Sequence, residues 1–171
     1  MKQLKIIASA GALLLVSLQA HAGDIISSVV STTTEFKVVN SAEATVSVSA
    51  RKDLAAGSVS GELTVGTWSG SVNAGTLAYR INRAVNPADS VNSTNPTVGV
   101  ASNSTDSSKK LAFFVNYQTE VSSSSQIIDG WRVMNQGVTA ISSNIRTLGG
   151  RNQVLLAGRY PIAIDVASYA F

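Results

Sequence analysis

Side chains of the types that perform catalysis or bind transition metals are scarce in this sequence. The 171 residues include no cysteine and one histidine, His21. Because His21 lies in an amino-terminal leader that we expect to be removed, the mature chain can form neither a Ser/His/Asp triad nor a Cys/His pair. Zinc sites built from nitrogen and sulfur ligands are excluded for the same reason.

The ten acidic residues leave acid–base catalysis by a pair of carboxylates formally open. No two of them lie within seven positions of each other, and the sequence has no Asp-x-Asp calcium loop. We expect each carboxylate to be solvated surface charge. Trp68 and Trp131 could stack on a sugar or a nucleobase, but we expect both to pack in the core or at its rim. The sequence therefore predicts a protein that is not an enzyme and that binds no metal or cofactor.

The first 22 residues have the three parts of a secretory signal peptide. Lys2 and Lys5 precede an apolar stretch over residues 6–18, and a cleavage site of the small-x-small type ends at Ala22. We expect export and cleavage at that point. Cleavage leaves eleven of the thirteen basic residues against ten acidic ones, a net charge of +1, which gives no electrostatic basis for binding nucleic acid. Without cysteine, no disulfide can stabilise the exported domain.

Short segments of alternating apolar and polar residues fill the rest of the sequence, as expected for strands with one buried face. Ala44, Val46, Val48 and Ala50, for example, fall on one face of a single segment. Loop-forming clusters separate the segments, and no stretch longer than ten residues shows the apolar stripe of a capped helix. The pattern predicts eight or nine strands in a sandwich or barrel. The expected strands are residues 26–38, 44–50, 61–68, 76–82, 97–100, 111–117, 130–135, 153–156 and 160–166.

Two segments resemble the structural subunits of chaperone–usher fimbriae, in particular those of the Saf-type atypical fimbriae of enterobacteria. The first, TEFKVVNSAEATVSVSARKDLAAG at 34–57, contains an extension with a central Phe, an aliphatic strand and a Lys/Ala/Gly turn. The second, AGRYPIAIDVASYAF at 157–171, is similar to the Tyr-Pro-Ile-x-aliphatic-Asp-Val-x-x-Tyr strand of these pilins. The segments GTLAYRI and TVGVASNS are also similar to family sequences.

The resemblance implies an all-β fold, namely an incomplete immunoglobulin-like β-sandwich that is completed by donor-strand exchange. Residues 41–171 would form this domain, whose last strand borders an open acceptor groove. Residues 23–40 would form a donor extension that inserts into the groove of a neighbouring copy. The expected groove edge is Tyr160, Ile162, Ile164 and Val166, and the expected inward-facing donor residues are Ile26, Val30, Thr32, Thr34, Phe36 and Val38.

The implied function is that of a major structural subunit in an adhesive fimbria on the cell surface. Its partners would be a periplasmic chaperone that first fills the groove, the outer-membrane usher, identical subunits in a head-to-tail polymer and, if the subunit is itself adhesive, a host-cell receptor. The main alternative is a monomeric exported sandwich that binds a sugar or a protein. Its site would be residues 86–108, which are rich in Ser, Thr, Asn and Pro and which we expect to form a long exposed connection. A secreted enzyme that works through carboxylates alone is the third alternative.

Overall fold

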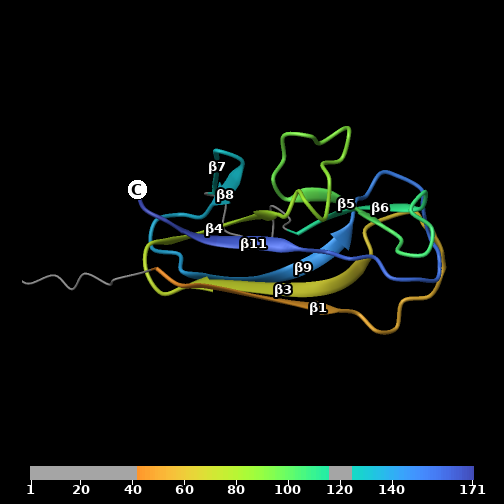
Figure 1. Cartoon of the computed structure of the whole chain (residues 1–171), viewed down its shortest axis with the longest axis horizontal. Coiled ribbons are helices and arrows are strands. Elements are labelled where there is room, and N and C mark those ends of the chain that lie inside the picture. Colours follow the sequence, from red (N-terminus) through yellow and green to blue (C-terminus); the bar gives the residue numbers. More distant parts are fainter. Residues whose placement is uncertain (1–41, 116–124) are drawn as a thin grey trace, which may run out of the picture. The chain divides into compact units, whose positions relative to one another are not determined.

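Eleven β-strands and no helix make up the described part of the chain, residues 42–115 and 125–171 of a computed structural model (Figure 1). These residues belong to one compact unit, Val38–Phe171, and they contain no helix that could cross a membrane. The strands are β1 (Ala44–Ala50), β2 (Gly57–Val59), β3 (Thr64–Val72), β4 (Thr76–Ile81), β5 (Val98–Ser102), β6 (Lys110–Phe114), β7 (Gln126–Ile128), β8 (Trp131–Val133), β9 (Ala140–Thr147), β10 (Gln153–Leu155) and β11 (Ile164–Tyr169).

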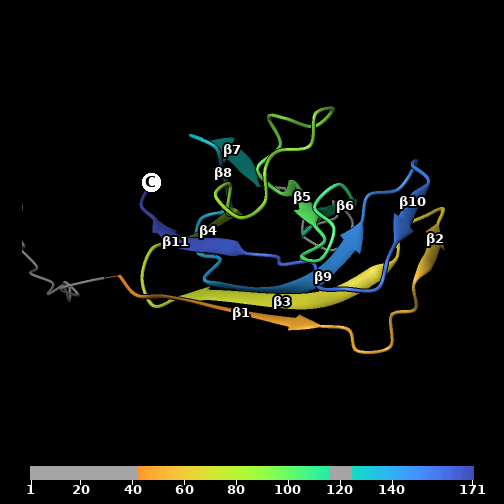
Figure 2. The same cartoon turned by 45° about the vertical axis from the view of Figure 1, so that its right-hand side comes forward.

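Two antiparallel sheets enclose the core (Figures 1 and 2). The larger sheet has the strand order β1-β3-β9-β6-β5 and the smaller one β11-β4-β8-β7, while β10 and β2 form a separate pair. Trp68 of β3 packs against Tyr79 of β4 with ring centroids 4.8 Å apart, and its Nε1 donates a hydrogen bond to the Val115 carbonyl at 2.6 Å. Trp131 is half-buried, with the Arg80 guanidinium carbon 4.2 Å from its ring centroid. The expected all-β sandwich is confirmed.

Alternation along the central strands explains why these segments form sheets. In β4 the inward-facing Leu77, Tyr79 and Ile81 have no exposed surface at all. In β3 the buried Trp68 lies between the exposed Thr67 and Ser69. Side chains that are apolar on one face and small and polar on the other suit a half-buried pleated surface, so the strands predicted at these positions are present.

The predicted count of eight or nine strands is too low, and the chief omission is β9, which lies between β3 and β6 in the larger sheet. Two of its buried residues are polar, since Ser143 is 8% and Thr147 0% exposed. Thr147 Oγ1 donates a hydrogen bond to the Gly61 carbonyl at 2.9 Å and accepts one from the Leu63 N–H at 2.8 Å. Because its hydroxyl is satisfied, Thr147 can occupy a core position beside Ile145. The short strands β2 and β7 are also absent from the prediction.

Residues 86–108 are not the long exposed connection that their composition predicts. They contain β5, and their buried polar side chains are Asn86, Asp89, Thr97 and Asn103. The Asn86 Nδ2 donates a hydrogen bond to the Pro161 carbonyl at 2.9 Å, and its Oδ1 accepts one from the Ala163 N–H at 2.9 Å. Asn86 therefore fixes the path of the chain just before β11.

Asp89 is also buried, which contradicts the expectation that every carboxylate is solvated surface charge. Its side chain is only 4% exposed, and its two oxygens accept hydrogen bonds from Arg151, Nη1 to Oδ1 at 2.5 Å and Nη2 to Oδ2 at 2.8 Å. Hydrogen bonds from Arg151 and then from Asn92 outweigh the effect of burial and lower the pKa of Asp89 from 3.8 to about 2. The ion pair joins the loop after β4 to the turn before β10.

Replacement of this carboxylate is expected to destabilise the fold in a pH-dependent way. The pKa of Asp89 is lower in the folded chain than in the unfolded one, so the ion pair stabilises the fold fully above pH 3.8 and loses its effect as the pH falls through about 2. Above pH 3.8 the ion pair contributes about 2 kcal/mol to the free energy of unfolding, and the substitution removes this contribution. In thermal unfolding, Asp89→Asn should melt below the wild type at pH 6, and the two curves should converge near pH 2.

Asp53→Asn is the matched control for this prediction. Asp53 pairs with Arg51 at 2.6 Å, but the two side chains are 71% and 40% exposed, and exposed ion pairs contribute little. We therefore expect almost no change in melting temperature at pH 6. A wild-type advantage over Asp89→Asn that persists undiminished at pH 2 would show that the carboxylate charge is not its cause.

Candidate functional site

Two strand edges that lack pairing partners border the candidate site. Among the described strands, β1 pairs only with β3 and β11 pairs only with β4, so each is the outermost strand of its sheet. β1 and β11 lie close to each other but do not pair with each other. An edge strand presents a row of N–H and C=O groups that lack ladder partners. An extended chain added between these edges could form hydrogen bonds with both.

The inward face of β1 is exposed, although its register directs it toward the core. Val46 lies opposite Gly70 and Val48 opposite Trp68 in the antiparallel pair, and directly opposite residues share one face of a sheet. Trp68 is only 2% exposed, whereas Val46 is 46% and Val48 is 42% exposed. The described chain therefore supplies no layer to cover these two valines.

An open cavity of about 590 Å³ continues this uncovered face at the carboxyl end of β1. Its apolar lining comprises Val48, Leu54, Val65, Leu111, Ile145, Leu155, Tyr160 and Ile162. Arg51, Lys52 and Arg159 contribute to the rest of the lining. The described lining residues include no carboxylate. The cavity is suited to hold large apolar side chains. We call the cavity and the uncovered face of β1 together the groove.

The four residues predicted to form the groove edge fall into two pairs in the structure. Tyr160 and Ile162 are half-buried and line the cavity. Ile164 is 7% exposed and belongs to the core. Val166 is half-buried over Gly70, where a Cβ atom would lie only 2.9 Å from Val166 Cγ2. Glycine at position 70 thus allows β11 to approach β3 closely, so the cavity lies at one end of the groove only.

The last strand also begins later than predicted, at Ile164 rather than at Tyr160. Pro161 has no N–H to donate to a ladder, and the side chain of Asn86 holds Pro161 and Ala163. The hydroxyl of Tyr160 accepts a hydrogen bond from the Leu156 N–H at 3.1 Å. These contacts keep residues 160–163 out of the sheet and leave Tyr160 and Ile162 to form the wall of the cavity.

Two lining residues had no role in the sequence prediction. Ile145 belongs to the unpredicted strand β9, and Leu54 lies in a segment with loop chemistry. An apolar residue in the polar turn KDLAAGS was the only available signal for Leu54. The predicted donor residues lie outside the described part of the chain; these are Ile26, Val30, Thr32, Thr34, Phe36 and Val38.

A two-sheet domain with an open apolar groove between unpaired edges has the geometry to accept an added strand. The sequence matches no known protein-family profile and no curated protein. Its fold is similar to that of the Salmonella SafD adhesin, with a TM-score of 0.58 at 13% identity over 77% of this chain and 90% of that one. The Escherichia coli Hda pilus minor tip subunit HdaB matches with a TM-score of 0.55 at 13% identity, over 75% of this chain and 84% of that one.

A third similar structure is AggB, the minor subunit of aggregative adherence fimbriae type I from Escherichia coli. Its TM-score is 0.52 at 15% identity, over 74% of this chain and 86% of that one. The chain thus has the fold of fimbrial adhesins and minor fimbrial subunits. The resemblance inferred from its sequence is confirmed at the level of the fold.

Proposed function

We propose that this protein is an exported structural subunit of a chaperone–usher fimbria. It polymerises when the extension at residues 23–40 of one copy inserts into the groove of the next. The observation that carries the proposal is the exposure of Val46 and Val48, which face the core beside two unpaired strand edges. An edge and an apolar surface left open in this way would normally promote aggregation, and an inserted strand covers both.

The expected energetics support a stable junction. Ile26, Val30, Phe36 and Val38 are the large apolar side chains on the inward face of the predicted donor. At ~1.5–3 kcal/mol per fully buried side chain, the four contribute roughly 6–12 kcal/mol before the cost of ordering the extension. Backbone hydrogen bonds along β1 and β11 add to this. The contact is head-to-tail and does not close on itself, so it generates a filament.

The combination of donor and groove in one chain favours a position inside the filament. A subunit at the end of a head-to-tail polymer needs only one of the two elements, whereas an internal subunit needs both. Some proteins of similar fold are a minor tip subunit or an adhesin, yet this chain has a predicted donor segment before β1. On this proposal the subunit forms the fimbrial shaft, its groove is filled by a periplasmic chaperone before assembly, and the outer-membrane usher exports it to the cell surface.

Deletion of residues 25–40 is expected to abolish polymerisation and to leave the domain folded. The deleted segment precedes β1, and among the described residues the core cluster and the side chains packed against it come from position 54 onward. We would co-express the truncated chain with its chaperone and compare unboiled samples of both forms on a denaturing gel. The wild type should give a ladder of oligomers, and the truncated form should remain in a soluble one-to-one complex with the chaperone.

Two outcomes would contradict the proposal. Fibres formed by the truncated chain would show that residues 25–40 are not the donor. A single monomer band from the wild-type protein would instead favour the monomeric binding module.

A further inference from the structure

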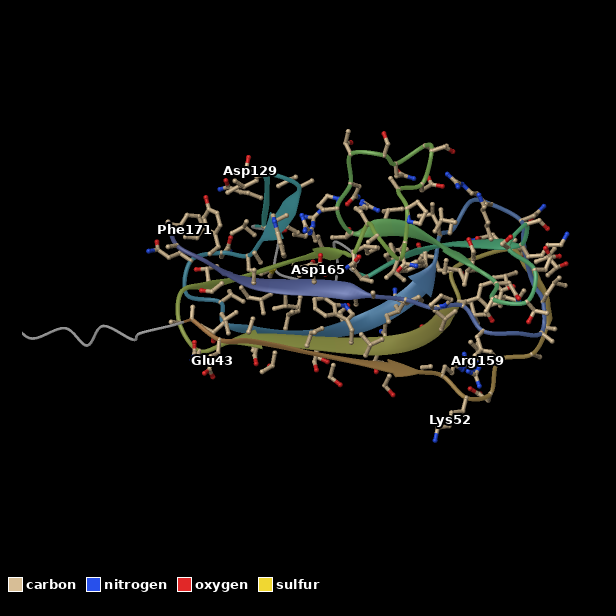
Figure 3. All side chains as sticks on the ribbon, in the orientation of Figure 1. Glu43, Lys52, Asp129, Arg159, Asp165 and Phe171 are labelled. Carbon is tan, nitrogen blue, oxygen red and sulfur yellow. The ribbon has the colours of Figure 1, made fainter. Side chains whose placement is uncertain are left out.

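Charged side chains of opposite sign lie toward the two ends of the domain, with Arg132 beside Asp129 and Asp106 in the hairpin next to Arg159 as exceptions. Figure 3 shows Glu43 and Asp129 toward one end and Lys52 and Arg159 toward the other. No ion pair is formed by any of these four side chains within the described residues, whereas Arg51 is neutralised by Asp53. We call the end with Glu43 and Asp129 the acidic end, and the end with Lys52 and Arg159 the basic end.

The groove has a direction relative to these ends. β1 begins next to Glu43 and ends next to Arg51, and the cavity lies at the basic end, where Lys52 and Arg159 are part of its lining. From the cavity, the uncovered face of β1 runs back toward the acidic end. A strand that fills the groove must therefore occupy the cavity at one terminus and extend along β1 from there.

The direction of the inserted donor follows from its length on either side of Phe36, and this step rests on the proposed function. Phe36 is the largest inward side chain, and the donor extends ten residues before it, to Ile26, but only a few residues after it. With Phe36 in the cavity, the ten preceding residues can be accommodated only along β1. The donor consequently runs parallel to β1, and its carboxyl end leaves the groove at the basic end.

The chain connection then brings two unlike ends together. Glu43 lies five positions after Val38, the last inward donor residue. Because an extended chain spans at most about 3.6 Å per residue, Glu43 of the donor copy lies within about 18 Å of the groove end where Val38 sits. The acidic end of the donor copy is thereby held against the basic end of the acceptor copy.

We propose that Lys52 and Arg159 of one subunit and Glu43 of the next form an electrostatic contact between consecutive subunits. This contact orients the incoming subunit before its strand inserts. Opposite charges on facing surfaces accelerate association and penalise wrong orientations, and an approach of two basic ends would be repulsive. The occupant of the basic end is therefore a second copy of this chain, presented by its acidic end.

The test compares whole-subunit polymerisation with insertion of a short peptide. In the double variant Lys52→Glu/Arg159→Glu, polymerisation at low salt should slow about tenfold, the lower limit of electrostatic steering effects. The difference should vanish near 1 M salt, where charges are screened beyond roughly 3 Å. Adding Glu43→Lys to the same chain reverses both ends and should restore the wild-type rate.

A capped peptide of residues 25–40 separates this inference from the proposed function. Lys52 and Arg159 line the cavity, so the variant for this comparison is Glu43→Lys, whose side chain is not among the residues lining the cavity. The peptide has no attached domain and should insert into Glu43→Lys at the wild-type rate, which also verifies that this variant is folded. Polymerisation of whole Glu43→Lys subunits should nevertheless slow.

Thr67→Glu/Ser69→Glu is the control, because it adds two negative charges at exposed positions in the middle of β3, away from both ends. Equal slowing by this control, or polymerisation of the Lys52/Arg159 and Glu43 variants at the wild-type rate, would overturn the electrostatic contact. If the peptide fails to insert even into the wild-type groove, the proposed function itself is wrong.

Discussion

A subunit whose residues 24–40 are fused behind Phe171 through a short flexible linker, and whose native extension is removed, is expected to be a hyperstable monomer. The carboxyl end of the chain lies at the same end of the domain as the start of β1 (Figure 1). The grafted strand can therefore enter the groove in the direction inferred for the donor. Insertion within one chain proceeds at an effective concentration on the order of millimolar.

The expected gain in stability is large because the graft covers Val46 and Val48 and fills the cavity. A net gain of about 5 kcal/mol would raise the melting temperature by roughly 15–30 °C for a domain of this size. Size-exclusion chromatography and thermal unfolding would measure both effects, with the chaperone-free wild-type subunit as reference. A graft of the same composition with a scrambled order is the control and should not stabilise. If the wild-type monomer is already stable and gains nothing from the graft, the interpretation as a pilin is wrong and the monomeric binding module is favoured.

Phe36→Asp is expected to abolish assembly. Phe36 is the largest predicted inward side chain of the donor, and the cavity floor that would receive it is formed by Val65, Leu111, Ile145 and Leu155. An aspartate there would be an unpaired charge among apolar residues, which costs several kcal/mol and removes the contribution of the aromatic ring. Co-expression with the chaperone, followed by an unboiled denaturing gel, should show subunit but no ladder.

Lys37→Asp is the matched control for this substitution. Lys37 is the next residue along the predicted strand and points to the opposite face, so the same new side chain should be solvated and assembly should continue. Equal loss of the ladder in both variants would show that the register of the donor differs from the one inferred here.

The alternation of side chains was sufficient to locate most of the strands along the chain. The segments 44–50 and 76–82 alternate cleanly and form β1 and β4, and the resemblance of 157–171 to a pilin strand agreed with the fold. A period of two is a local property of the backbone, since successive side chains of a strand point to opposite faces. The class of fold and the positions of these strands along the chain therefore follow from the sequence.

The polar residues of the core could not be recognised in this way. Thr147 and Asn86 look like surface or loop residues, and only their partners explain their burial: Gly61 and Leu63 for Thr147, Pro161 and Ala163 for Asn86. These partners are more than 70 positions away in the sequence. Whether a buried polar group is satisfied depends on the tertiary structure, which is why β9 and the buried part of 86–108 escaped prediction.

The groove also combines a property that the sequence predicts with one that depends on the tertiary structure. Val46 and Val48 already indicated the apolar face of β1 in the sequence. The sequence did not indicate that this face is left uncovered in the folded chain. That property depends on how β11 packs against the larger sheet, to which the close approach at Gly70 and the hydrogen bond from Asn86 to Pro161 contribute. The sequence by itself thus determined which residues can pair as strands, because alternation is local. The tertiary structure alone decided which strand edges and which apolar side chains remain open, because exposure depends on every other packed segment.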